Sequence, residues 1–141
     1  MTEREIVRCE QIWVVLGGNK VCLLDTSEAD RASLRTRFNQ LREIVLLGAD
    51  AIPGIGIHAR SRMSEMACLA HELSHAQRFY MGIDRPTERP DVFLDEAEAS
   101  LHASFLSPIS FTDRQDLVED ARLQIATWQD YTANQGEENE C

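Results

Sequence analysis

The pattern of hydrophobic and polar positions predicts a small β element at the start of the chain. Residues 5–25 are typical of a β-hairpin, because the apolar run 12–16 is rich in β-branched residues and the apolar run 21–24 follows it. A Gly-Gly-Asn sequence between the two runs supplies the positive backbone angles of a tight turn. The continuous apolar character favours strands covered on both faces. We therefore expect this hairpin to be scaffold.

Apolar residues next recur at helical spacing, which predicts an amphipathic helix over residues 26–48. Thr26 or Ser27 can cap its start, and Gly48 lies where it should end. The helix would present Leu34, Phe38, Leu41, Ile44 and Val45 on its apolar face.

Residues 51–58 are short, apolar and β-branched, and their proline and two glycines favour an edge strand. The unpaired backbone groups of an edge strand can hold an extended peptide by β-augmentation. The stretch between Ile55 and His58 is therefore a candidate peptide-binding strand.

The second half of the chain predicts three helices. Residues 63–79 contain no proline or glycine, and Ser61 or Ser64 can cap that helix. After a proline-containing loop over residues 82–90, a second helix is expected over residues 91–106, and a last one from Thr112 or Asp113. The acidic tail, residues 134–141, is expected to be disordered. These elements predict a compact α+β fold with a single domain over residues 1–133.

Composition narrows the classes of function. A chain of 141 residues that is 43% hydrophobic suits one domain with a core. The net charge of −10 argues against binding to nucleic acid or to anionic membranes. The start of the chain does not resemble a signal peptide, and no apolar run approaches membrane-spanning length. We therefore expect a cytoplasmic protein. Delivery by a specialised secretion system would leave no such trace in the sequence. The four cysteines form no CxxC pair and are expected to be reduced thiols.

The sequence His71-Glu72-Leu73-Ser74-His75 carries the strongest chemical signal. Residues four apart on a helix lie one turn above each other, so both imidazoles can bind one Zn²⁺. Glu72 lies beside them, where a carboxylate can take a proton from a zinc-bound water.

A catalytic zinc usually has three protein ligands, and the helix predicted over residues 91–106 is the expected source of the third. Its candidate ligands are Asp95, Glu96, Glu98 and His102. Periodicity alone does not decide among them. Glu98 borders the apolar face, whereas Glu96 lies on the opposite side beside a strip of small residues.

The His-Glu-x-x-His motif followed by Glu96-Ala97-Glu98-Ala99-Ser100 resembles the gluzincin metallopeptidases, in which a glutamate on a later helix is the third ligand. A small residue usually stands three positions after that glutamate. Ala99 stands there for Glu96, whereas bulky Leu101 stands there for Glu98, so the resemblance implies Glu96.

Within that class the chain is most similar to the ImmA/IrrE-like family, with the minigluzincins next. The similarity covers about residues 69–108. His102 stands where the family tends to have an aromatic residue, Pro108 comes slightly early, and no helix-turn-helix partner domain is present.

The sequence thus predicts a zinc-dependent metalloendopeptidase with one Zn²⁺ per chain on His71, His75 and Glu96, and with Glu72 as general base. A second oxyanion donor is expected, for which His102, Tyr80 and Arg78 are candidates. Of these, His102 is predicted to be a catalytic residue. One alternative is a degenerate zincin that binds metal and acts as a protein-interaction module. Another is a regulatory protein in which the motif is accidental.

Overall fold

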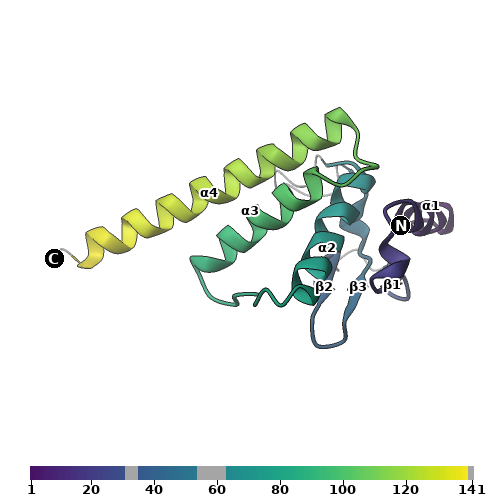
Figure 1. Cartoon of the computed structure of the whole chain (residues 1–141), viewed down its shortest axis with the longest axis horizontal. Helices are drawn as coiled ribbons and strands as arrows, with labels where there is room; N and C mark the ends of the chain where they lie inside the picture. The colour runs from purple at the N-terminus through teal and green to yellow at the C-terminus, as the bar shows by residue number, and fades with distance from the viewer. Residues whose placement is uncertain (31–34, 54–62, 140–141) are drawn as a thin grey trace.

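The computed structural model describes residues 1–30, 35–53 and 63–139, without the side chains of residues 136–139. Within these residues it shows four α-helices and a three-stranded mixed sheet, which confirms the predicted α+β class (Figure 1). The elements in chain order are α1 (Glu3–Val15), η1 (Gly18–Lys20), β1 (Leu23–Asp25), β2 (Arg37–Asn39), β3 (Ile44–Leu46), η2 (Ala49–Ala51), α2 (Glu65–Tyr80), α3 (Asp91–Ser104) and α4 (Phe111–Asn139).

β3 is the central strand of the sheet, whose order is β1-β3-β2. It pairs with β1 in parallel and with β2 antiparallel, and Val45 is the partner of both Leu24 and Phe38. All three residues of β3 are buried. Among the described strands β2 has β3 as its only neighbour, so one side of β2 is an edge.

The predicted hairpin over residues 5–25 is wrong, because its first half is the helix α1. Thr2 caps this helix: its side chain accepts a hydrogen bond from the Glu5 N–H, and the Glu5 carboxylate accepts one from the Thr2 N–H. Cys9, Trp13 and Leu16, at helical spacing, are buried in the core. The apolar run 12–16 is thus the end of a helix that buries Trp13 and Leu16 and exposes Val14 and Val15, and only Leu23–Asp25 forms a strand.

The helix predicted over residues 26–48 is also wrong, since this stretch contains β2 and β3. The Asn39 side chain accepts hydrogen bonds from the N–H groups of Leu41 and Arg42, both at 3.1 Å, and so turns the chain between β2 and β3. Glu43 has a positive φ of 54°, which a helix interior does not allow.

The strand predicted over residues 51–58 is not a strand at its start, where Ala51 ends the short helix η2. Residues 54–58, including Ile55 and His58, lie outside the described residues, so the peptide-binding strand stays a prediction.

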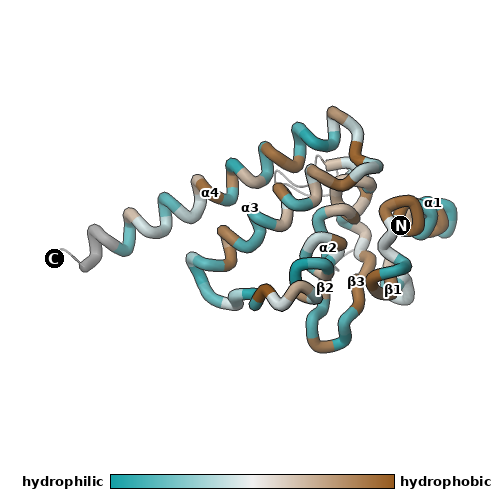
Figure 2. The backbone as a smooth tube through the Cα atoms, viewed as in Figure 1, coloured by the Kyte–Doolittle hydropathy of each residue, from teal (hydrophilic) through white to brown (hydrophobic). Residues whose placement is uncertain are grey.

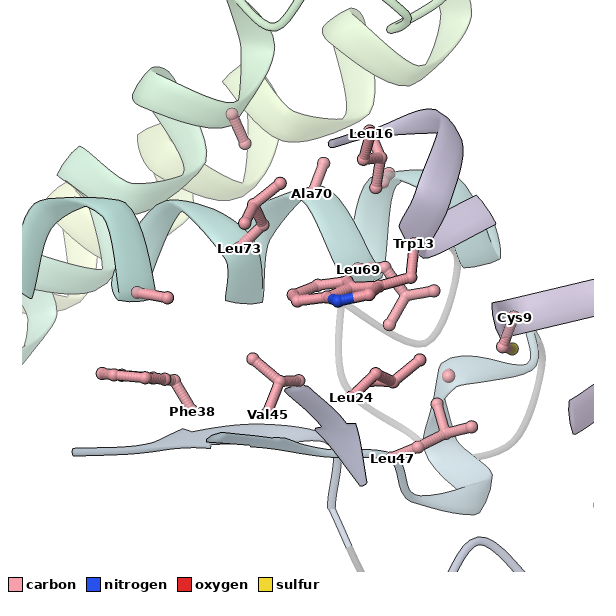
Figure 3. Close-up of a cluster of buried hydrophobic side chains, with 14 of the residues drawn as sticks. Cys9, Trp13, Leu16, Leu24, Phe38, Val45, Leu47, Leu69, Ala70 and Leu73 are labelled. Atoms are coloured by element: carbon pink, nitrogen blue, oxygen red, sulfur yellow. The ribbon is translucent and has the colours of Figure 1, made fainter. Parts of the chain in front are cut away.

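The main core lies between α2 and one face of the sheet (Figure 3). Leu69 and Leu73 of α2 belong to one buried cluster with Leu24, Val45 and Phe38 of the three strands. Leu69, Leu73 and Ala76 are fully buried and form the core face of this helix. This packing leaves the other side of α2 free to face α3.

α3 lies beside α2, and α4 runs back along α3 and extends beyond it (Figure 1). Hydrophobic and hydrophilic positions alternate along α4 (Figure 2). Among the described residues, no helix is long and apolar enough to cross a membrane. The helix predicted over residues 91–106 is confirmed as α3. The tail differs from the prediction, since α4 continues to Asn139. Extending an existing helix costs little for residues such as Ala, Gln and Glu.

Candidate metal centre

α2 places its two histidines one turn apart. Ser64 caps the helix by accepting a hydrogen bond from the Ala67 N–H at 3.0 Å, which confirms one of the two predicted caps. His71 and His75 are only 2% and 3% exposed, and their Nε2 atoms lie 3.1 Å apart. The two rings therefore direct the same nitrogen to one point.

Glu96 of α3 brings a carboxylate to that point. Its Oε2 lies 3.0 Å from His71 Nε2, and its Oε1 lies 3.4 Å from His75 Nε2. One ligand atom from each of the three residues lies within 4.8 Å of the others. A tetrahedral ion with bonds of about 2.0–2.1 Å would place its ligand atoms roughly 3.3 Å apart. The donor set and its spacing therefore fit a metal ion.

The structure separates the two glutamates that the sequence left in competition. Glu98 has a side chain that is 58% exposed, and its Oε2 accepts a hydrogen bond from Arg78 Nη2 at 2.5 Å. Glu96 is the carboxylate that reaches His71 and His75.

Asp95, another candidate ligand, lies near Nδ1 of His75 rather than near its Nε2. Its Oδ2 is 3.5 Å from His75 Nδ1 and 3.6 Å from Arg85 Nε, which are ion-pair distances. None of the described residues forms a hydrogen bond of normal geometry with this oxygen. Its Oδ1 accepts a hydrogen bond from Arg78 Nη2 at 3.2 Å. Asp95 therefore borders the second nitrogen of a candidate ligand.

Glu72 is turned toward the sheet. The side chain is buried, with 5% of the residue exposed, and its Oε2 accepts a hydrogen bond from the backbone N–H of Phe38 at 2.9 Å. Phe38 lies in the edge strand β2, and this N–H points away from β3. The edge of the sheet thus holds the motif glutamate.

Sequence reasoning missed Arg85, which comes from the loop before α3. Its Nη1 donates to the carbonyl oxygen of Phe38 at 3.0 Å, and its Nη2 donates to Glu96 Oε1 at 3.4 Å. The guanidinium thereby links β2 to Glu96. A loop has no periodicity, so the sequence had no signal that would direct this residue to the site.

The structure gives the three candidate oxyanion donors other surroundings. His102 is six residues from Glu96, so it projects from a different side of α3. Its Nδ1 is 3.1 Å from Ser74 Oγ, and with Tyr80 it lines a largely apolar groove. Burial, followed by the charge of Arg78, lowers the pKa of His102. Arg78 itself pairs with Asp95 and Glu98. These contacts add no support for His102 as a catalytic residue, and that role stays a prediction.

Comparisons of the chain with protein-family models, with curated proteins and with solved structures found no match.

Proposed function

We propose that the chain is a zinc-dependent metalloendopeptidase of the gluzincin type with a zincin-like fold, acting in the cytoplasm. The observation that carries the proposal is the convergence of His71 Nε2, His75 Nε2 and the Glu96 carboxylate next to a motif glutamate. Two histidines and one glutamate form a donor set used by catalytic zinc. The resemblance of residues 69–108 to the ImmA/IrrE-like family supports the same class.

Each side chain has a distinct role in this proposal. His71, His75 and Glu96 would hold the ion. A bound Zn²⁺ supplies Lewis-acid chemistry, lowering the pKa of water and polarising a carbonyl. Glu72 would accept the proton of the attacking water and return it to the leaving amine. The hydrogen bond from Phe38 would fix one oxygen of that carboxylate while the reaction proceeds.

The proposed substrate is an extended peptide or protein segment. We propose that it pairs with the edge expected between Ile55 and His58, as the sequence predicts. The outward backbone groups of the described edge, at Phe38 in β2, already bond to Glu72 and Arg85.

One observation favours a second candidate, a metal-binding interaction module without proteolytic activity. Glu72 is buried and its carboxylate is engaged by the Phe38 N–H, which by itself gives this glutamate a structural role. Metal binding alone therefore does not distinguish the two candidates.

The test combines metal analysis with turnover. Protein purified without chelator should contain about one zinc per chain and should cleave members of a mixed peptide library, as read by mass spectrometry. His71→Ala should lose both properties. Zinc binding without cleavage would favour the interaction module, whereas the absence of zinc uptake would contradict both candidates.

A further inference from the structure

The second ring nitrogen of His71 leads to the last helix of the chain. Its Nδ1 lies 2.8 Å from Ser100 Oγ in α3, and Ser100 Oγ donates to Asp120 Oδ2 in α4 at 2.6 Å. The three residues are 2%, 0% and 3% exposed. A continuous set of buried hydrogen bonds thus joins α2, α3 and α4.

The chemistry of these groups sets the direction of each hydrogen bond. A hydroxyl has one proton, and a carboxylate can only accept. Since Ser100 donates its proton to Asp120, its oxygen must accept from His71 Nδ1–H. A neutral imidazole carries one N–H, so Nε2 of His71 then holds a lone pair. That atom lies 3.0 Å from Glu96 Oε2, so the two acceptors suit a cation bound between them and would repel each other without one.

Burial makes this arrangement of protons costly to reverse. The opposite tautomer would place a lone pair of Nδ1 against a lone pair of Ser100 Oγ, or would require Ser100 to abandon Asp120. Either change leaves a polar group without its partner in a site away from water, where such a loss is most expensive. The acceptor on α4 therefore determines which nitrogen of His71 can bind a metal.

We propose that Asp120 is a positioning residue of the metal centre, acting through Ser100 to keep the proton of His71 on Nδ1 and the lone pair on Nε2. The inference rests on the proposed function only in taking His71 as a ligand. It makes α4 a functional part of the centre, although α4 contributes no ligand to the group of His71, His75 and Glu96. Residues that orient metal-binding histidines typically contribute 10–100-fold to metal affinity.

A second serine–aspartate pair in the chain provides a matched control. Ser64 Oγ donates to Asp113 Oδ1 at 2.7 Å and likewise ties α4 to another helix. This pair ends at the cap of α2 instead of at a histidine ring. Removing Asp113 therefore removes a similar link between helices without touching His71.

The first measurement is zinc affinity by competition with a chromophoric chelator. Asp120→Ala and Ser100→Ala should each weaken zinc binding about 10–100-fold. Asp120→Asn keeps an acceptor oxygen and should recover part of the affinity, while Asp113→Ala should stay close to wild type. The double variant S100A/D120A should have a zinc affinity no lower than that of the single variant with the lower affinity. Both substitutions act on one chain of hydrogen bonds, so their effects should not add.

The second measurement needs no activity. Nitrogen-15 NMR of the zinc-bound wild type should show His71 protonated at Nδ1 with Nε2 as the zinc ligand, and in Ser100→Ala the Nδ1 proton should exchange faster with water. Protonation at Nε2 in the wild type would overturn the proposal, as would a folded Asp120→Ala variant with wild-type zinc affinity. If Asp120→Ala fails to fold, Ser100→Ala and the wild-type spectrum decide. A protein that passes both tests but cleaves nothing would contradict the peptidase and leave the role of Asp120 standing.

Discussion

The backbone N–H of Phe38 in β2 donates a hydrogen bond to Oε2 of Glu72 in α2 across 34 positions of sequence and a distance of 2.9 Å. The motif glutamate is therefore held by the sheet, while the two histidines of the same motif face α3. The histidines and the glutamate of one motif thus have different neighbours, α3 and β2.

Glu72→Gln should separate these two roles. Glutamine keeps an oxygen that can accept from the Phe38 N–H, so the fold and the zinc content should not change. The loss of the proton acceptor should lower kcat by about 10²–10⁴-fold in the peptidase assay. Glu65→Gln, in the first turn of the same helix, is the control and should keep its activity. Wild-type turnover by Glu72→Gln would remove Glu72 from the mechanism.

Glu96→Gln and Glu98→Gln should differ in their effect on zinc affinity. Glu96→Gln replaces a charged ligand with an amide. The zinc affinity should fall by at least the 10–100-fold that is typical when a residue that only orients a metal ligand is removed. Glu98 pairs with Arg78 and is largely exposed, so its replacement should change zinc affinity little. A competition titration that gave the reverse order would identify Glu98 as the ligand.

Leu73→Ala should destabilise the protein strongly, because Leu73 of α2 is fully buried in the hydrophobic core. Removing a buried leucine side chain typically costs about 2–5 kcal/mol. Leu41→Ala is the matched control, since Leu41 is 93% exposed in the turn after β2 and should change the free energy of unfolding by no more than about 0.5 kcal/mol. Urea denaturation followed by circular dichroism measures both values. Equal midpoints for the two variants would contradict the packing described for α2.

Because of His102, the free energy of unfolding should depend on pH below 6.5, which is the ordinary pKa of a histidine. Burial lowers its pKa in the folded protein, and Arg78 adds to the shift. Well above pH 6.5 the ring is neutral in both the folded and the unfolded state. As the pH falls below that value the unfolded chain takes up the proton first, so stability falls until the pH passes the lowered pKa.

His102→Gln should therefore lose less stability than wild type between about pH 7.5 and pH 5. Urea midpoints of metal-free protein at both pH values measure the difference, in which the contributions of the other histidines largely cancel. An equal or larger loss of stability in the variant would show that His102 is not held in its neutral form.

Local sequence signals predicted the part of the site that lies on single helices. The His-Glu-x-x-His spacing, the Ser64 cap and the small residues near Glu96 all act within a few turns, and the structure reproduces α2 and α3 accordingly. The contacts that complete the site are non-local. Neither Asp120 nor Arg85 has a local pattern that relates it to His71 or Glu96.

The errors in the first third of the chain have the same origin. Phe38, Ile44 and Val45 have helical spacing, but pairing with β1 and the turn at Asn39 override it. In α1 the apolar run 12–16 obscured the helical spacing of Cys9, Trp13 and Leu16. The capping box of Thr2 and Glu5 was a readable signal for this helix.

The candidate ligands come from two helices, with 25 positions separating His71 from Glu96. An ion held between them would act as a cross-link that exists only while α2 and α3 are docked. Its binding free energy would then add to the free energy of unfolding, by about 4 kcal/mol at a free concentration a thousand times the Kd. The supply of the metal would thereby govern how long the chain survives proteolysis, whether or not a substrate is present.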